Sequence, residues 1–227
     1  MAPWPLALVS VLRSLPTSRL LWSVLALDAL CVVLALAHRL EVVASPMFSL
    51  GYDWGLGEIA QYAKEVLAMG AAIVLFRARR EPVYLAVAGL LLALLVDDAT
   101  RFHEVAGEAI SGALSIPALP GIRGQDVGEV LALASWAVPL GLAGLVAYVK
   151  SDRLARHHAR LFGAAVVVLA GFGVVADLVH QAFSTVWGLS FALEVVEEGG
   201  ELVTMSVIAA AIVAVARRVA LGLESEA

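Results

Sequence analysis

The residues best suited to chemistry are four glutamates inside an apolar stretch near the C-terminus. They lie in "FALEVVEEGGELVTM", residues 191–205, which is otherwise as apolar as a membrane span. At 100° per residue on a helix, they fall within an arc of about 100° and form one stripe about 10 Å long. Carboxylates arranged in this way can bind a cation or carry protons. The stripe consists of Glu194, Glu197, Glu198 and Glu201.

Other segments carry polar groups with helical spacing. "ADLVHQ" places Asp177 and His180 at i and i+3, on one helix face, with Gln181 beside them. "LLVDDATRFHEVAGE" is predicted to be one continuous helix, on which Asp98 and His103 point away from the shared acidic face. That shared face consists of Asp97, Arg101, Glu104 and Glu108.

The segment "GEIAQYAKEV" adds Glu58, Gln61 and Glu65 on one face, with Lys64 beside it. An acid at the centre of a membrane helix costs about 2.5 to 3.5 kcal/mol, so these carboxyls require protons, basic partners or a bound cation. Arg101, Lys64 and His180 are the nearby basic groups, too few for this many acids.

We therefore predict a divalent metal site. Carboxylates combined with imidazole favour zinc, iron or manganese. The predicted ligands are Asp97, Glu104, Asp177, His180, Glu194, Glu197, Glu198 and Glu201. The predicted supporting residues are Glu58, Gln61, Glu65, Arg101, His103 and Glu108. The alternative is that these acids line a wet cap at the membrane surface and extend outward into water.

Several other chemistries are excluded. "HEVAG" at 103–107 has glycine where a zinc-protease helix needs its second histidine. No nucleophile elbow, phosphate-binding loop or dinucleotide fingerprint is present. The lone Cys31 excludes a disulfide within the chain and a cysteine-based zinc site. A net charge of -5 gives no reason to expect nucleic-acid binding.

Composition indicates which elements must position these residues. The chain is 61% hydrophobic and 15% charged, with a mean hydropathy of +0.91, values typical of a multi-pass membrane protein. We expect an all-α bundle of about six transmembrane helices, each about 20 residues long. The predicted spans are 20–38, 58–76, 83–102, 127–149, 161–183 and 189–215. Segment 1–19 is predicted to be cytoplasmic or interfacial, 20–216 to be the membrane domain, and 217–227 to be a short tail.

The basic residues predict the orientation. With the N-terminus in the cytoplasm, eleven of the fifteen lysines and arginines lie inside, which satisfies the positive-inside rule. The four exceptions are Arg39, Lys64, Arg101 and Arg123. Both termini are therefore expected in the cytoplasm, and the acidic site at the extracytoplasmic side.

Outside the site, most polar residues are expected to be structural. Asp28, in the middle of the first span, is expected to pair with a neighbouring helix or to join a proton path. Gly199-Gly200 is expected to permit close helix packing. The remaining histidines are expected to contact water or lipid headgroups; they are His38, His157 and His158.

"DDATRFHE" together with "EVVEEGGEL" resembles segments of uncharacterised bacterial multi-pass membrane proteins. This resemblance implies a bacterial plasma-membrane protein and no particular activity. A looser likeness in design links the chain to membrane hydrolases of the alkaline ceramidase and adiponectin-receptor type. Those proteins hold zinc with histidines and an aspartate among their helices, and that set of several histidine ligands is missing here.

Two functions follow from these patterns. The first is a metal-dependent membrane enzyme, a hydrolase or oxidoreductase, acting on a lipid or other apolar small molecule. The second is a cation- or proton-coupled transporter. The nearly uncharged inner halves of the later spans favour the enzyme, because no polar path crosses the membrane.

Overall fold

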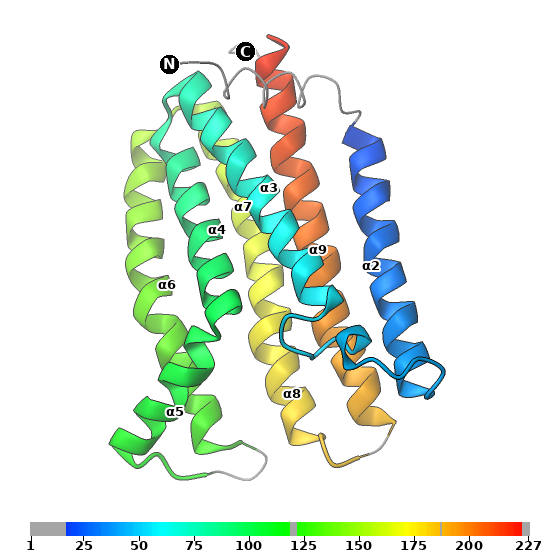
Figure 1. Ribbon diagram of the computed structural model, residues 1–227. Helices are drawn as coiled ribbons and strands as arrows, with labels where there is room; N and C mark the ends of the chain where they lie inside the picture. Colours follow the sequence, from blue (N-terminus) through cyan, green and yellow to red (C-terminus); the bar gives the residue numbers. More distant parts are fainter. Residues whose placement is uncertain (1–16, 119–121, 187, 224–227) are drawn as a thin grey trace, which may run out of the picture.

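The protein is a helical bundle in the computed structural model, which describes residues 17–118, 122–186 and 188–223. Within these ranges there is no strand, and six helices are long and apolar enough to cross a membrane. Figure 1 shows them side by side, with both ends of the described chain at the same end of the bundle. The predicted all-α membrane fold is confirmed. The predicted interfacial segment at the N-terminus lies largely outside the described residues.

The spans begin and end close to the predicted limits. They are α2 (Thr17–Arg39), α3 (Leu56–Arg79), α4 (Pro82–Thr100), α6 (Gly124–Lys150), the segment Arg153–Ala182, and α9 (Leu189–Ala220). The segment Arg153–Ala182 comprises α7 (Arg153–Ala170), the π-helical η2 (Gly171–Ala176) and α8 (Asp177–Ala182). Two short helices, η1 (Pro46–Phe48) and α5 (Phe102–Leu114), lie between spans.

The largest difference in limits is at the start of α7. The fifth span is predicted to start at residue 161, whereas α7 already begins at Arg153. Asp152 caps this helix, because its carboxylate accepts a hydrogen bond of 2.7 Å from the backbone N–H of Ala155. Asp152 also accepts a 2.6 Å hydrogen bond from Arg79. These polar contacts lie at the end of the bundle, where the chain turns between α6 and α7.

The bundle has two chemically different ends. We call the end that carries the α3–α4 and α6–α7 turns the basic end; it includes Arg79, Arg80 and Lys150. We call the other end, which carries η1, α5 and the turn between α8 and α9, the acidic end. In Figure 1 the basic end is at the top.

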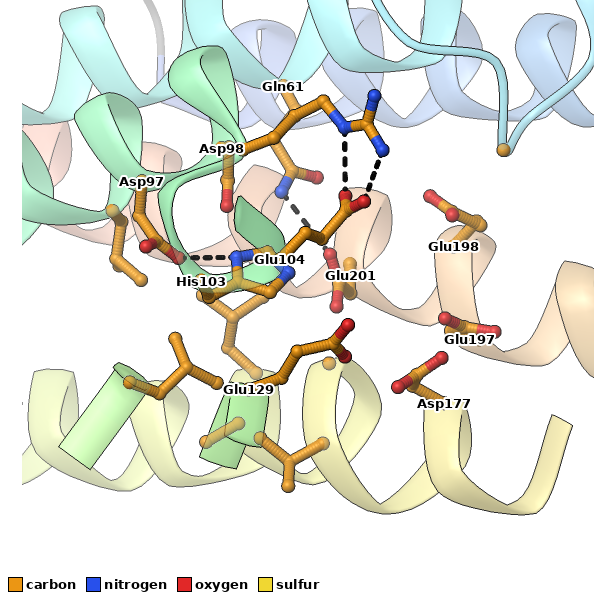
Figure 2. A pocket seen from close by; sticks show the side chains of 18 of the residues that line it. Gln61, Asp97, Asp98, His103, Glu104, Glu129, Asp177, Glu197, Glu198 and Glu201 are labelled. Carbon is orange, nitrogen blue, oxygen red and sulfur yellow. Dashed lines mark hydrogen bonds and ion pairs between the residues drawn. The ribbon is translucent and has the colours of Figure 1, made fainter. Parts of the chain in front are cut away.

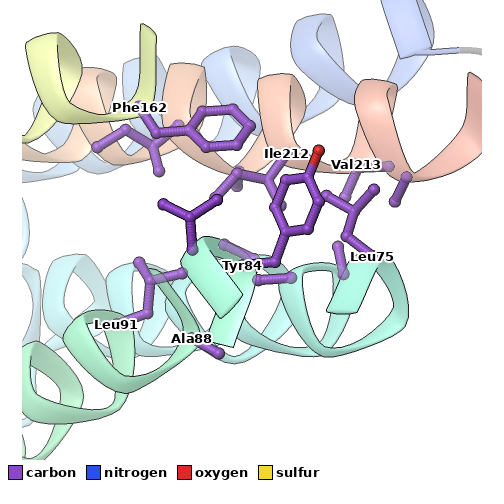
Figure 3. Packing of buried hydrophobic residues seen from close by; sticks show 14 of the residues in the cluster. Leu75, Tyr84, Ala88, Leu91, Phe162, Ile212 and Val213 are labelled. Carbon is purple, nitrogen blue, oxygen red and sulfur yellow. The ribbon is translucent and has the colours of Figure 1, made fainter. Parts of the chain in front are cut away.

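An apolar core fills the half of the bundle nearer the basic end. Figure 3 shows Leu75 of α3, Leu91 of α4 and Phe162 of α7 packed with Ile212 and Val213 of α9. Alanines on the facing surfaces of α3 and α9 let these two helices approach closely; they are Ala68, Ala71, Ala72, Ala209 and Ala216. The core closes this half of the bundle against water.

One histidine prediction was wrong. His158 is 5% exposed rather than solvated, and its Nδ1 lies 2.8 Å from the hydroxyl of Tyr84, which is itself buried. Tyr84 lies in the first turn of α4 next to the basic end, so the two polar groups satisfy each other at the edge of the apolar core. His157 is exposed, as expected, and His38 lies 2.9 Å from the carbonyl of Val43.

A buried ion pair joins three helices beside the core. Lys64 Nζ of α3 lies 2.9 Å from Asp28 Oδ1 of α2 and donates a second hydrogen bond of 2.7 Å to the carbonyl of Leu202. Ser206 of α9 donates to the other Asp28 oxygen at 2.5 Å. The predicted pairing of Asp28 with a neighbouring helix is confirmed.

Candidate functional site

A cavity of about 760 Å³ opens among α3, α4, α5, α6, α7, η2, α8 and α9, mainly in the half of the bundle nearer the acidic end. Its wall is strongly acidic. Figure 2 shows Asp98, Glu129, Asp177, Glu197 and Glu201, from four different helices, directed into the same space. The lining acids are Asp53, Glu58, Glu65, Asp97, Asp98, Glu104, Asp126, Glu129, Asp177, Glu194, Glu197, Glu198 and Glu201.

The four basic side chains that line this cavity are already paired. Arg101 lies 2.8 Å from Asp53 and also pairs with Glu104. Arg123 lies 2.6 Å from Asp126.

The two imidazoles are paired in the same way. His103 Nδ1 lies 2.8 Å from Asp97, and His180 Nδ1 lies 2.6 Å from Glu197. Eight lining acids are left without a cationic partner among the described residues: Glu58, Glu65, Asp98, Glu129, Asp177, Glu194, Glu198 and Glu201.

Neutral donors satisfy some of these acids. Tyr62 donates to Glu58 at 2.8 Å, and the Gln125 amide donates to Glu129 at 2.8 Å. Glu194 accepts from the hydroxyl of Ser49 and the N–H of Gly51, at 3.4 and 3.3 Å. These hydrogen bonds fix the carboxyl groups in place but supply no positive charge.

Glu65 differs from the other acids. It is 1% exposed, and neither carboxyl oxygen accepts a hydrogen bond from any donor in the described part of the chain. The carboxyl groups of Asp98 and Glu201 are its acidic neighbours. The adjacent Lys64, which the sequence analysis counts among the nearby basic groups, pairs with Asp28 and not with these acids. A carboxyl buried in this way needs either a proton, which it can share with the neighbouring carboxyl of Asp98, or a bound cation.

The structure brings the predicted residues together with one exception. All eight predicted ligands line the cavity, as do the supporting residues Glu58, Gln61, Glu65, Arg101 and His103. Glu108 is exposed and does not line it.

The prediction of one continuous helix over the "DDATRFHE" segment was wrong. Arg101 adopts a left-handed conformation, with φ of 53°, so α4 ends at Thr100 and α5 starts at Phe102 in a new direction. His103 therefore turns back to Asp97, and Asp98 faces the cavity, whereas both had been assigned to other faces. Glu108 leaves the shared face for the same reason.

The sequence prediction missed the contribution of α6. Asp126 and Glu129 lie in its first turns, and Asp53 comes from the turn before α3. Glu129 lies near the predicted start of its span, at the depth of the other acids, which is the signal that could have identified it.

Two glycines shape the wall between η2 and α9. A Cβ at Gly173 would lie 2.4 Å from Glu201 Oε1, so only glycine leaves that carboxyl its present position. A Cβ at Gly200 would collide with the ring of Phe172, which confirms the predicted packing role for Gly200, whereas a Cβ at Gly199 would make only ordinary contacts. The π-helical turn lies directly before Asp177 and His180 and therefore sets their register against α9.

Groups at the mouth of the cavity have shifted pKa values. Burial opposes the charged form of His103, but its hydrogen bond to Asp97 and the nearby carboxylates outweigh burial and raise its pKa to about 9. The hydrogen bond from Arg101 lowers the pKa of Glu104. His103 is therefore a cation at neutral pH, and its charge is committed to Asp97.

No three histidine, cysteine, aspartate or glutamate side chains in the described residues are arranged to hold a metal ion. Asp177, His180 and Glu197 are the residues closest in kind to such a set, because His180 contacts Glu197 and the carboxyl of Asp177 lies beside that of Glu197. Coordination there would require these side chains to turn.

A family described as "Domain of unknown function (DUF8692)" matches residues 29–215. The chain belongs to this family. No curated protein and no solved structure matches the chain. The matched range contains every residue that lines the cavity, from Ser49 to Leu202, so the cavity lies wholly within the family domain.

Proposed function

We propose that this integral membrane protein binds a divalent metal cation in the acidic cavity and uses it as an enzyme on a lipid or other apolar substrate. The supporting observation is the surplus of eight carboxyl groups without cationic partners around one cavity. Among them Glu65 is almost fully buried and accepts no hydrogen bond from the described residues. Unneutralised carboxyls at this depth oppose folding, so a cation or protons must accompany them.

The metal would lie between α8 and α9. His180 provides the imidazole, and Asp177 and Glu197 provide the nearest carboxylates, with Glu194 and Glu198 on the adjoining turns of α9. This mixed set suits zinc, iron or manganese better than calcium or magnesium, which prefer oxygen alone. A metal there would supply Lewis acidity and an activated water, or oxygen chemistry if it is iron. The acidic end would face the extracytoplasmic side.

Metal analysis tests this proposal. The protein is purified in mild detergent with a tag that contains no histidines, and its metal content is measured by mass spectrometry. We expect a stoichiometric transition metal in the native chain and its loss in His180→Ala and Glu198→Gln. Glu108→Gln is the matched control, because Glu108 is an exposed acid outside the cavity. A native protein without metal, whose thermal stability responds neither to chelators nor to added zinc or manganese, would refute the proposal.

Transport is the second candidate, because buried ionisable groups such as Glu65, Asp28 and Lys64 often mark ion pathways in membranes. The apolar core around Leu75, Leu91 and Ile212 opposes it, since it separates the cavity from the basic end. A flux assay in liposomes discriminates between the two. Cation or proton movement that is abolished in Glu198→Gln would favour transport over catalysis.

A further inference from the structure

The cavity has an apolar side, which we call the apolar compartment and which the metal proposal does not use. Its wall is apolar and is formed by α4, α6 and α7, on the side that leads toward the core. The residues that line it are Leu90, Leu94, Val130, Leu133, Trp136, Ala137, Val166, Leu169 and Ala170. A bare cation gains nothing from such a wall, so the compartment indicates a ligand with an apolar part.

Trp136 supplies the one unsatisfied donor on this wall. Its indole Nε1 is buried and has no hydrogen-bond acceptor among the described residues. Buried tryptophan N–H groups usually find an acceptor, and a missing one costs about 1 to 3 kcal/mol. The donor therefore indicates that a ligand carries an acceptor atom into an otherwise apolar space.

Spacing along α6 connects the two compartments. Glu129 and Trp136 are seven residues apart, so they lie on one face of the helix and about 10 Å apart along its axis. Both line the same cavity. A ligand whose charged or polar end lies beside Glu129 would reach Trp136 with a group about 10 Å further along.

We propose that the cavity binds a single-chain amphiphile. Its polar end lies among the carboxylates and the bound cation, its chain lies between α4, α6 and α7, and an ester, amide or hydroxyl oxygen accepts the Trp136 N–H. The volume of about 760 Å³ suits one ligand of this size. The placement of the polar end rests on the proposed metal function; the apolar compartment and Trp136 do not.

Fluorescence quenching tests the proposal directly. In the first variant Trp136 is the sole tryptophan, and Trp4, Trp22, Trp54 and Trp187 are replaced by phenylalanine. The probe is a monoacyl lipid brominated in mid-chain, titrated into protein held in phosphatidylcholine nanodiscs. We expect saturable quenching that the same lipid without bromine reverses.

The matched control keeps only Trp22, which is 70% exposed on the outer surface of α2. Its quenching should rise in proportion to the brominated lipid in the bilayer, without saturation. If Trp136 behaves like Trp22, or is not quenched at all, the amphiphile site is refuted.

A second pair of variants separates this proposal from the metal proposal. Trp136→Phe keeps the apolar wall but removes the donor, so binding of a radiolabelled monoacyl lipid should weaken about fivefold, the equivalent of one hydrogen bond. Metal content should not change. In His180→Ala, conversely, the metal should be lost while the saturable quenching of Trp136 by the lipid chain persists. Equal lipid affinity in Trp136→Phe and the native protein would refute the proposed contact.

Discussion

Two groups of charged residues lie inside this bundle, and they differ in whether the protein itself neutralises their charges. Asp28 and Lys64 form a closed unit: each charge faces the other, and Ser206 and the Leu202 carbonyl take up further hydrogen-bonding capacity. The acidic cavity is open: eight of its carboxyls have no cationic partner in the described residues, and Glu65 has no donor there. A structural charge in the membrane is neutralised by the protein itself. Charges left without such neutralisation indicate a site for something that the chain does not supply.

The first prediction breaks the closed unit. Asp28→Leu leaves Lys64 charged and unpaired at 2% exposure, and should destabilise the protein by about 3 to 5 kcal/mol. Lys64→Met should act similarly, because it leaves Asp28 unpaired. The double variant Asp28→Leu/Lys64→Met should recover most of the loss, since no charge then remains buried. Equilibrium unfolding in detergent measures all three. A double variant as unstable as the sum of the single variants would show that the pair does not act as a unit.

The second prediction concerns the pH dependence of stability that His103, at the edge of the acidic cavity, should cause. The pKa of His103 is raised from 6.5 to about 9, mainly by Asp97, so its contribution to stability is fully present below about pH 6.5. It declines as pH rises and is lost above about pH 9. Compared with His103→Gln, the native protein should be more stable by about 2 kcal/mol at acidic pH, after allowance for the partly exposed ring, and equal to it near pH 10. A stability difference that does not vary with pH would contradict a charged His103–Asp97 pair.

The third prediction removes the most isolated carboxyl. Glu65→Gln should stabilise the metal-free protein by about 1 kcal/mol, because the amide is uncharged and can donate to the neighbouring acid Asp98. Thermal unfolding in the presence of a chelator measures this effect. Glu108→Gln serves as the surface control and should change stability by less than about 0.5 kcal/mol. Destabilisation by Glu65→Gln would mean that the carboxyl already has a partner that the amide cannot replace.

The helix layout was predictable because each membrane span is a long apolar run of sequence with polar residues at both ends. The predicted span 58–76 became Leu56–Arg79, and 127–149 became Gly124–Lys150. The convergence of acids on one cavity was predictable for a related reason: lipid exposure of carboxyls is so unfavourable that the side chains must face inward.

What could not be predicted depends on single backbone angles and on tertiary partners. Arg101 interrupts the α4–α5 helix in a left-handed conformation, although no glycine or proline stands there to signal it. That one residue redirects His103 and Asp98. The partner of Lys64 could not be predicted either, because both Glu65 and the distant Asp28 are plausible from sequence. Only the packing of α2 against α3 decides between them.

The last prediction has the smallest effect on stability. In Gly173→Ala the new Cβ would displace the Glu201 carboxyl, which lies at the end of a flexible side chain and can move at little cost. The helix propensity of alanine, worth up to about 1 kcal/mol, offsets part of the strain, so stability should change by less than about 0.5 kcal/mol. The position of Glu201 among the carboxyls without cationic partners would nevertheless shift, and metal affinity should fall about tenfold, as when a supporting contact is lost.

Gly163→Ala is the matched control, since no atom lies within 4 Å of its new Cβ. It should gain the stability that the helix propensity of alanine provides, without any effect on metal affinity. If both variants bind metal equally well, the position of Glu201 has no effect on metal binding. The contrast between the closed Asp28–Lys64 unit and the acidic cavity would then rest on the other seven carboxyls without cationic partners.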